Sequence, residues 1–165
     1  YYLNLSTGQI RSECVTEVES EFPTFNTSYA GKQNDVTYTA CSVDNGANSF
    51  FNAISRVTRD GDSTVVTLPP GYYGSEPVFA PSLEAKREDD GYLLEVVYDG
   101  FKHRSELQIY RADNINELVC SARLKHHLPH QFHGFFANQS LYFIRYFYFL
   151  IILTLFLTFP QQKRA

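Results

Sequence analysis

The sequence has no methionine and no tryptophan among its 165 residues, and it begins at Tyr1. A chain without methionine does not read as a complete open reading frame, so we expect part of a longer protein. Basic residues are also few, with 14 Lys and Arg against 18 Asp and Glu, a net charge of -4 and no basic cluster interleaved with aromatic residues. This charge pattern excludes a typical nucleic-acid surface, and we expect no nucleic-acid partner.

Cysteine is scarce as well. Cys14, Cys41 and Cys120 lie far apart in the sequence and form no CxxC pair. An odd and widely spaced set suits a reduced compartment better than a disulfide framework, which indicates a cytoplasmic location.

No stretch before Phe136 sustains the periodicity of an amphipathic helix. Short strands between turn residues are indicated instead, and the alternation over residues 36–41 is typical of a half-buried strand. Asn45-Gly46 and Asp60-Gly61 are suited to tight reversals, because these residues tolerate positive φ. The expected strands cover residues 36–41, 50–57, 64–68, 77–80, 92–98, 106–110 and 118–124. Strands spaced in this way predict a propeller, a barrel or a sandwich.

Residues 141–159 are almost wholly apolar, with Arg145 as the one charged interruption. A run of about twenty residues is long enough to span a bilayer as a helix, with Lys163 and Arg164 at one membrane face. The competing interpretation is an out-of-frame or read-through segment, because the run is dense in Phe and Tyr and lacks a helix cap. Both interpretations stay open, and the division expected is 1–136 for the β region and 137–165 for the tail.

Four of the five histidines lie in the stretch LKHHLPHQFHGFF, residues 124–136. Pro129 interrupts regular structure, and His133 follows it on a short turn between Phe132 and Gly134. A neutral imidazole on such a turn can ligate iron or zinc, although a lone histidine near a loop is more often a hydrogen-bonded surface residue. A zinc site from His126, His130 and His133 would require helical spacing, which the proline disfavours.

Several segments taken together resemble the carotenoid cleavage oxygenases, non-haem iron enzymes built on a seven-bladed β-propeller. The segments are Glu21–Pro23, Ser75–Phe79, Glu88–Leu94, Leu124–Gly134, and Ser105–Leu107 followed by Ile109. Their order and spacing resemble the C-terminal third of such enzymes, a family that includes lignostilbene dioxygenase and the retinal pigment epithelial isomerase. The resemblance implies an all-β fold with about two C-terminal blades over residues 1–136, and it does not extend to the tail.

The resemblance also implies roles for three residues. His133 corresponds to the last of the family's four iron-binding histidines, and Glu21 and Glu76 to two of the glutamates that accept a hydrogen bond from a ligand histidine. Such a carboxylate fixes the tautomer and orientation of the imidazole and raises its basicity. We expect Glu88-Asp89-Asp90 to be a solvated charged turn instead. Plain core packing is expected for the aromatic residues Phe132, Phe135 and Phe136, with the lining of an apolar tunnel as the alternative.

The activity implied is oxidative cleavage of a carbon–carbon double bond in a carotenoid, an apocarotenoid or a stilbene-like substrate by O2, with one Fe(II) ion in the intact enzyme. Three more ligand histidines would be needed, and His103 matches no ligand motif. We therefore expect the isolated chain neither to bind iron tightly nor to cleave carotenoids. The alternative is a non-catalytic, membrane-tethered β domain that binds a partner. The expected location is cytoplasmic or at a membrane surface, with residues 141–159 as the candidate anchor.

Overall fold

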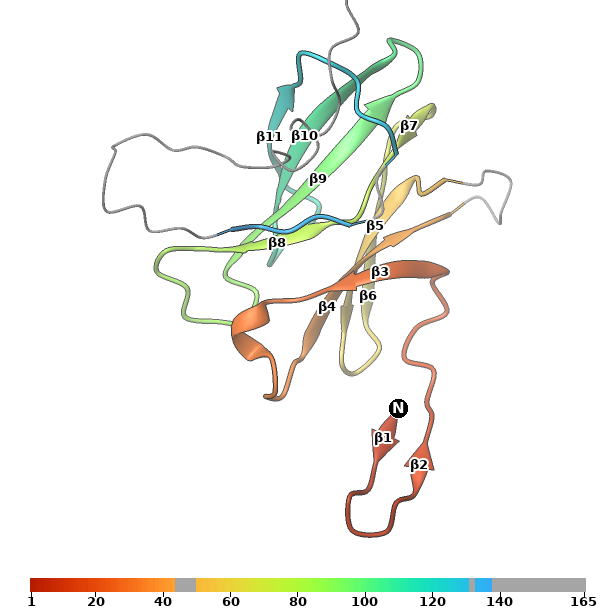
Figure 1. Cartoon of the computed structure of the whole chain (residues 1–165), viewed down its shortest axis with the longest axis vertical. Coiled ribbons are helices and arrows are strands. Elements are labelled where there is room, and N and C mark those ends of the chain that lie inside the picture. Colours follow the sequence, from red (N-terminus) through yellow and green to blue (C-terminus); the bar gives the residue numbers. More distant parts are fainter. Residues whose placement is uncertain (44–49, 131–132, 138–165) are drawn as a thin grey trace, which may run out of the picture.

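The computed structural model describes residues 1–43, 50–130 and 133–137. The regular structure of the described residues is almost wholly β, which confirms the all-β prediction (Figure 1). One short 3-10 helix, η1, covers Thr27–Tyr29. A two-stranded hairpin of β1 (Tyr2–Leu3) and β2 (Ile10–Arg11) stands apart from two larger antiparallel sheets.

The first sheet has four strands in the order β3-β4-β5-β6, so that neighbours in sequence are neighbours in space. Its strands are β3 (Ser20–Thr24), β4 (Val36–Cys41), β5 (Ala53–Thr58) and β6 (Ser63–Thr67). The predicted reversal at Asp60-Gly61 joins β5 to β6, and Gly61 there has φ +94, a conformation that favours glycine. The predicted turn at Asn45-Gly46 lies outside the described residues.

The second sheet has five strands and is centred on β9. Its strands are β7 (Tyr72–Tyr73), β8 (Val78–Pro81), β9 (Gly91–Asp99), β10 (Arg104–Arg111) and β11 (Leu118–Arg123). One edge of β9 pairs with β10 along its whole length, and the other edge pairs with β8 and then β7. Every strand predicted from the sequence is present within a few residues, whereas β1, β2, β3 and β7 were not predicted.

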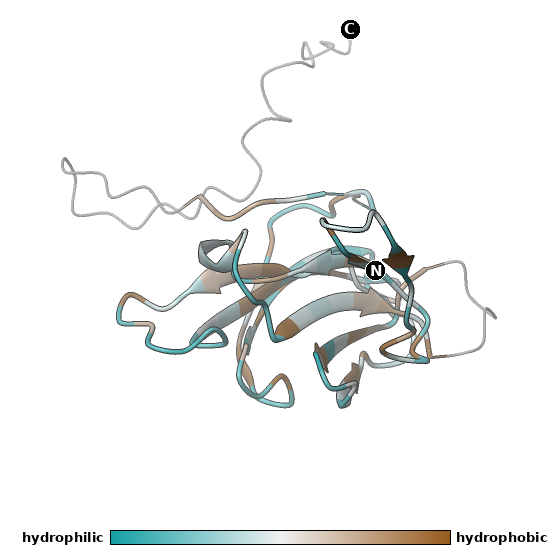
Figure 2. Cartoon of the chain, turned by 90° about the horizontal axis from the view of Figure 1, so that it is seen from below, coloured by the Kyte–Doolittle hydropathy of each residue, from teal (hydrophilic) through white to brown (hydrophobic). Residues whose placement is uncertain are grey.

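One cluster of buried side chains joins the two sheets. Its members are Val36, Tyr38, Ile54, Phe79, Leu93, Tyr110, Ala112 and Ile115. The Tyr38 ring stacks on the Phe79 ring with centroids 5.9 Å apart, and the Tyr38 hydroxyl donates to the Ala112 carbonyl at 3.0 Å. Hydrophobic residues lie mainly in the strands and hydrophilic ones in the connecting turns (Figure 2). The sheets therefore pack as one unit whose buried tyrosine has a hydrogen-bond partner.

Strand β4 is more deeply buried than its alternating pattern predicted. Five of its six positions are buried, and Thr37 alone is half-buried. The second face can be buried despite its polar residues because the hydroxyls of Thr39 and Ser55 hydrogen-bond to each other at 2.6 Å. The prediction of a half-buried strand was wrong for this reason.

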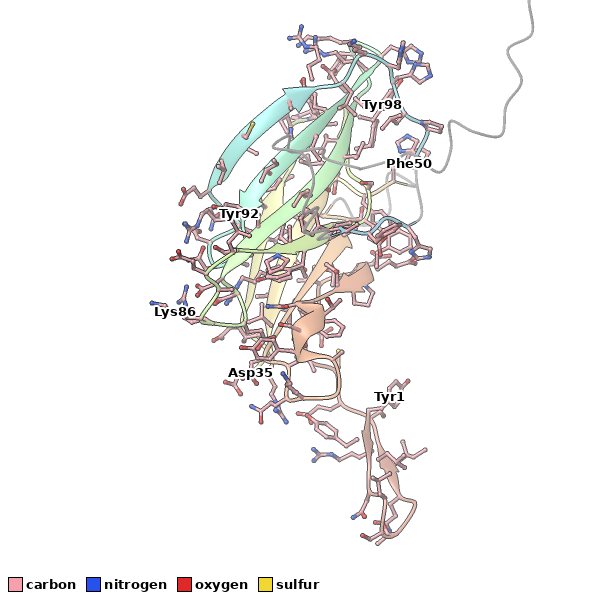
Figure 3. All side chains as sticks on the ribbon, turned by 60° about the vertical axis from the view of Figure 1, so that its left-hand side comes forward. Tyr1, Asp35, Phe50, Lys86, Tyr92 and Tyr98 are labelled. Carbon is pink, nitrogen blue, oxygen red and sulfur yellow. The ribbon has the colours of Figure 1, made fainter. Side chains whose placement is uncertain are left out.

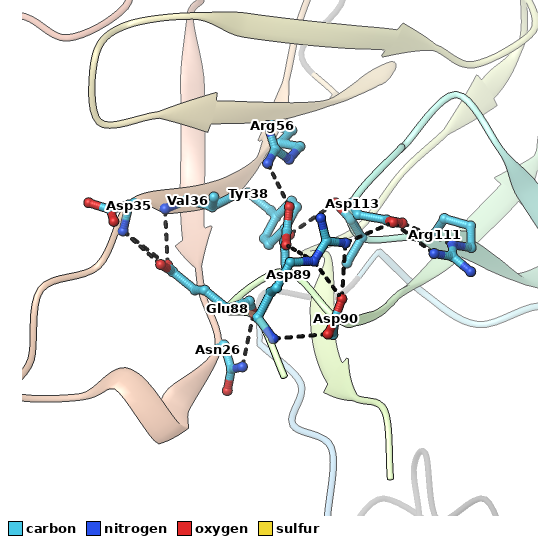
Figure 4. Close-up of polar contacts among 12 residues, drawn as sticks. Asn26, Asp35, Val36, Tyr38, Arg56, Glu88, Asp89, Asp90, Arg111 and Asp113 are labelled. Carbon is cyan, nitrogen blue, oxygen red and sulfur yellow. Dashed lines mark hydrogen bonds and ion pairs between the residues drawn. The ribbon is translucent and has the colours of Figure 1, made fainter. Parts of the chain in front are cut away.

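The acidic turn before β9, residues 88–90, is linked to the first sheet by hydrogen bonds (Figure 4). Glu88 accepts hydrogen bonds from the backbone N–H groups of Asp35 and Val36, each at 3.0 Å, and its own carbonyl accepts from Asn26 Nδ2 at 2.9 Å. These bonds fix the loop before β4 against the start of β9. The prediction that this turn is solvated was wrong for Glu88, whose partners lie more than fifty positions away along the chain and give no local signal.

Asp89 and Asp90 continue the same network. Arg56 donates to Asp89 at 2.9 Å, and the two side chains are only 19% and 15% exposed. Asp90 accepts the backbone N–H groups of Lys86 and Arg87 at 2.8 and 2.9 Å, which closes the loop on itself. These contacts, drawn in Figure 4, are structural, and the described residues hold no group of three His, Cys, Asp or Glu side chains able to bind a metal ion.

No helix within the described residues is long and apolar enough to cross a membrane. The apolar run 141–159, with its expected helix, and Phe132 lie outside the described residues.

Candidate metal-ligand site

Glu76 lies in a β-bulge between β7 and β8. Tyr73 pairs with Tyr98 and Val78 pairs with Leu94, so the four residues 74–77 lie opposite the three residues 95–97 of β9. One extra residue on the edge strand is the definition of a bulge, and bulges re-aim side chains beside functional sites. The Ser75 hydroxyl accepts the Val96 N–H at 3.2 Å and so takes the place of a ladder bond.

The re-aimed carboxylate contacts the segment that carries His133. Gly134 donates its backbone N–H to Glu76 Oε2 at 2.7 Å, and His133 Nδ1 lies 3.5 Å from both carboxylate oxygens. The shorter bond anchors the backbone, and the longer one lies at the outer limit of a hydrogen bond. With Nδ1 as the donor, the lone pair of Nε2 is free to face a metal ion.

A second bulge supports the same imidazole from the first sheet. The β3–β4 register shifts between Glu21 and Thr24, and Phe22 there has φ +54, a strained conformation for an aromatic residue. The Phe22 ring meets the His133 ring edge-on, with centroids 5.4 Å apart and planes at 81°. The Phe51 ring also packs against Phe22, with centroids 5.4 Å apart. The strained backbone at Phe22 thus places an aromatic ring against His133.

Glu21 occupies this second bulge but does not reach His133. Its side chain is exposed, and it is paired with no histidine within the described ranges. The structure therefore brings Glu76, His133 and Phe22 together and leaves Glu21 apart. The predicted role of Glu21, with a different ligand histidine, stays a prediction.

Two of the three other histidines in this segment, His127 and His130, pack against other rings, whereas His126 is exposed. His127 stacks on His103 with centroids 4.4 Å apart, and His130 stacks on Phe50 at 4.2 Å with Tyr98 edge-on at 5.5 Å. Phe50 and Tyr98 lie at the same end of the molecule (Figure 3). These contacts point His127 and His130 at separate partners, so the conceivable zinc triad with His133 does not form in the described part of the chain. No sequence pattern indicates the pairing of Phe50 with His130, because this contact depends on how the strands are placed.

A small cavity of about 40 Å³ lies between the 133–136 segment and one face of the second sheet. Its lining is mostly apolar and includes Val78, Leu94, Val96, Leu107 and Phe136, together with Glu76 and His133. Phe135 also contributes but is 70% exposed, so the expectation that it packs in the core was wrong. The 133–136 segment lies over the sheet face that carries Leu94 and Val96, outside the core cluster, and Phe135 stays largely open to solvent there.

The donor set offers one coordination position. The His133 side chain is 75% exposed, so the described residues do not enclose its ring. An imidazole oriented by a carboxylate is a normal ligand for Fe(II) and other divalent transition metals. Within the described residues no second ligand converges on it, so a complete centre would need ligands from outside this part of the chain.

Comparison with known proteins identifies the family. The family described as RPE65, retinal pigment epithelial membrane protein, matches residues 1–138. The chain belongs to this family. Membership confirms the resemblance to carotenoid cleavage oxygenases drawn from the sequence segments.

The curated relatives are enzymes acting on carotenoids by name. The chain is similar to the apocarotenoid-15,15'-oxygenase of Synechocystis, with 33% identity over 120 residues that cover 72% of this chain and 24% of the relative. It is 32% identical to the carotenoid dioxygenase carX of Gibberella fujikuroi, over 67% of this chain and 17% of the relative. A carotenoid 9,10(9',10')-cleavage dioxygenase of Crocus sativus is 30% identical over 83% of this chain and 28% of its own length.

Solved structures confirm the fold. The chain superposes on an ACO/RPE65 chimera with a TM-score of 0.77 and 28% identity, covering 83% of this chain and 29% of that one. Cobalt-substituted Synechocystis ACO gives a TM-score of 0.74 with 28% identity, covering 79% and 28%. The two larger sheets therefore match part of a propeller of this family. The chain spans between 17% and 28% of the length of the three curated relatives named above.

Proposed function

We propose that this chain forms the last part of an Fe(II)-dependent dioxygenase that cleaves a carbon–carbon double bond of a carotenoid or apocarotenoid. His133 supplies one of four iron ligands, and the other three come from sequence outside this chain. The observation that carries the proposal is the contact of Glu76 with both His133 and Gly134. The names of the relatives and the cobalt-substituted neighbour support an oxygenase with a metal site.

The residues of the site each have a physical task. Glu76 holds the proton on Nδ1 of His133 and keeps Nε2 unprotonated for the metal. Phe22 restricts rotation of the ring through its edge-on contact at 5.4 Å. When bound, an iron(II) ion with four imidazole ligands supplies open positions where dioxygen and a double bond can meet. Glu21 orients another ligand histidine in the same way.

The substrate class follows from the relatives, and a stilbene-like substrate is the second class to assay. Because carotenoids partition into lipid, the protein would meet its substrate at a membrane surface. Turnover of β-carotene, an apocarotenal and a hydroxystilbene by one preparation of the longer protein separates these substrate classes.

The sequence encoded immediately before Tyr1 tests the proposal first. We expect it to continue the reading frame and to contain three well-separated histidines. A stop codon or an unrelated domain there would instead favour the alternative of a non-catalytic, membrane-tethered β domain.

In the longer protein, His133→Ala should lose iron and reduce turnover to background. The matched control is His126→Ala, because His126 is exposed in the same segment. Iron content by elemental analysis and product formation by chromatography give the two readouts. Full activity of His133→Ala contradicts the ligand assignment, and stoichiometric iron in the isolated 165-residue chain contradicts the need for outside ligands.

A further inference from the structure

Glu95 is a buried carboxylate without a partner. It lies in the middle of β9 with 1% of its surface exposed, and neither Oε1 nor Oε2 has a hydrogen-bond partner within the described residues. An ionised carboxylate in such a place is strongly unfavourable, and proteins usually avoid it by keeping the group protonated. Glu95 belongs to neither the core cluster nor the contacts of His133.

The backbone of the Glu76 bulge packs directly on this carboxylate. A Cβ atom added to Gly74 would lie 2.1 Å from Glu95 Oε1, so only glycine leaves room for the acid. Gly74 is the first residue of the bulge, and its N–H donates to the Phe51 carbonyl at 2.9 Å. The first residue of the bulge, Gly74, therefore packs on Glu95. Two residues later, Glu76 accepts the hydrogen bond from Gly134.

The titratable neighbours of Glu95 offer it no positive charge. Burial raises the pKa of Cys41 in β4 and of Tyr110 in β10, and the negative charge of ionised Glu95 raises both further. Gln108, its register partner on β10, is uncharged and accepts from the Tyr110 hydroxyl. Burial alone raises the pKa of Glu95 to about 8.

We infer that Glu95 is a positioning residue for the Glu76–His133 pair: protonated, it supports the bulge, and on losing its proton it displaces Gly74 and loosens the hold of Glu76 on Gly134 and His133. Ionisation requires the carboxylate to gain water or to move, and either change acts first on the backbone that touches it. The inferred movement of the bulge does not require bound iron. Its consequence for catalysis rests on the proposed function.

The sign of the pH dependence follows from proton linkage. In the unfolded chain the pKa of Glu95 has its ordinary value of 4.5, whereas burial raises it to about 8 in the folded chain. Between these values the folded state binds more protons, so stability falls as pH rises from 4.5 to 8 and then levels off. An uncharged residue of the same shape removes this slope.

The test follows the backbone amide of Gly134 by NMR in the full chain, because this N–H donates to Glu76. We expect its chemical shift to change with an inflection near pH 8, and Glu95→Gln to abolish that inflection. A change caused by the His133 ring persists in Glu95→Gln, so only the part that disappears reports on Glu95. Glu84→Gln, at an exposed position in the loop before β9, is the matched control and should leave the inflection in place.

Urea unfolding between pH 5 and 8 gives a second readout. We expect the midpoint to fall with pH in the native chain, and the fall to be reduced by about half or more in Glu95→Gln. If that variant fails to fold, the 13C shift of the Glu95 carboxyl in the native chain replaces it. A carboxyl already ionised at pH 6, or a Gly134 amide that does not respond while Glu95 titrates, overturns the inference.

These outcomes separate the inference from the proposed function. If His133→Ala is active and the native protein still shows the Gly134 inflection, the role of His133 at iron is refuted and the coupling of Glu95 to the bulge stands. If His133→Ala is inactive and the Gly134 amide of the native protein does not respond to pH, the coupling of Glu95 to the bulge is refuted and the role of His133 at iron stands.

Discussion

Gly134 donates its backbone N–H to the carboxylate of Glu76 at 2.7 Å across 58 positions of sequence. The bond joins an edge bulge of the second sheet to the segment that carries the candidate ligand. The orientation of His133 is therefore set by the pairing of β7 and β8 with β9, and not by its own short turn. Since Glu76 lies at the edge of a paired sheet, the imidazole has its partner on a rigid element, as a metal site requires.

Glu76→Gln should weaken metal binding by about ten- to a hundredfold in the protein that carries all its ligands. The amide keeps one acceptor oxygen for Gly134 or His133 but loses the negative charge and the second acceptor. Titration of the apoprotein with Fe(II) measures the affinity, and Glu84→Gln serves as the control. An unchanged affinity would show that the carboxylate does not support the ligand.

Glu88→Ala should destabilise the fold by about 1–3 kcal/mol, because two backbone donors lose their acceptor. Those donors belong to Asp35 and Val36, and Val36 is only 8% exposed. Urea unfolding of the chain measures the change. Glu84→Ala, in the same loop but exposed, should stay within about 0.5 kcal/mol of the native chain. Equal effects of the two variants would contradict a structural role for Glu88.

Much of the fold follows from local sequence features, whereas its long-range contacts do not. Period-two patterns and turn residues predicted the longer strands, because both signals are local. The burial of β4 depends on the hydrogen bond between Thr39 and Ser55, and the role of Glu88 depends on Asp35, 53 positions away. A single sequence carries no signal for such pairs, so both were misjudged.

The candidate site shows the same limit. Resemblance to known enzymes singled out His133 and Glu76, and the structure places Nδ1 of the histidine 3.5 Å from the carboxylate. Their roles at iron stay predictions. The bulges at residues 74–77 and at Phe22 were not predicted, because a register shift is defined only against the partner strand. The supporting position of Phe22 could not be inferred for the same reason.

Gly91→Ala should destabilise the chain through overpacking at the start of β9. An added Cβ would lie 2.5 Å from the Ala80 carbonyl oxygen and 2.7 Å from the Phe79 ring, and the backbone of β8 cannot yield without losing its ladder. Overpacking of this kind costs about 1–3 kcal/mol.

Gly100→Ala is the matched comparison for this glycine. Its nearest contact, the Gly71 carbonyl oxygen, would be 3.0 Å away, so a shift of a few tenths of an ångström relieves it. Urea midpoints of the two variants should therefore rank with Gly91→Ala as the less stable. Equal midpoints, or the opposite order, would mean that β8 shifts freely to accommodate the added Cβ. The packing of β8 on β9 would then not fix the position of the bulge that carries Glu76.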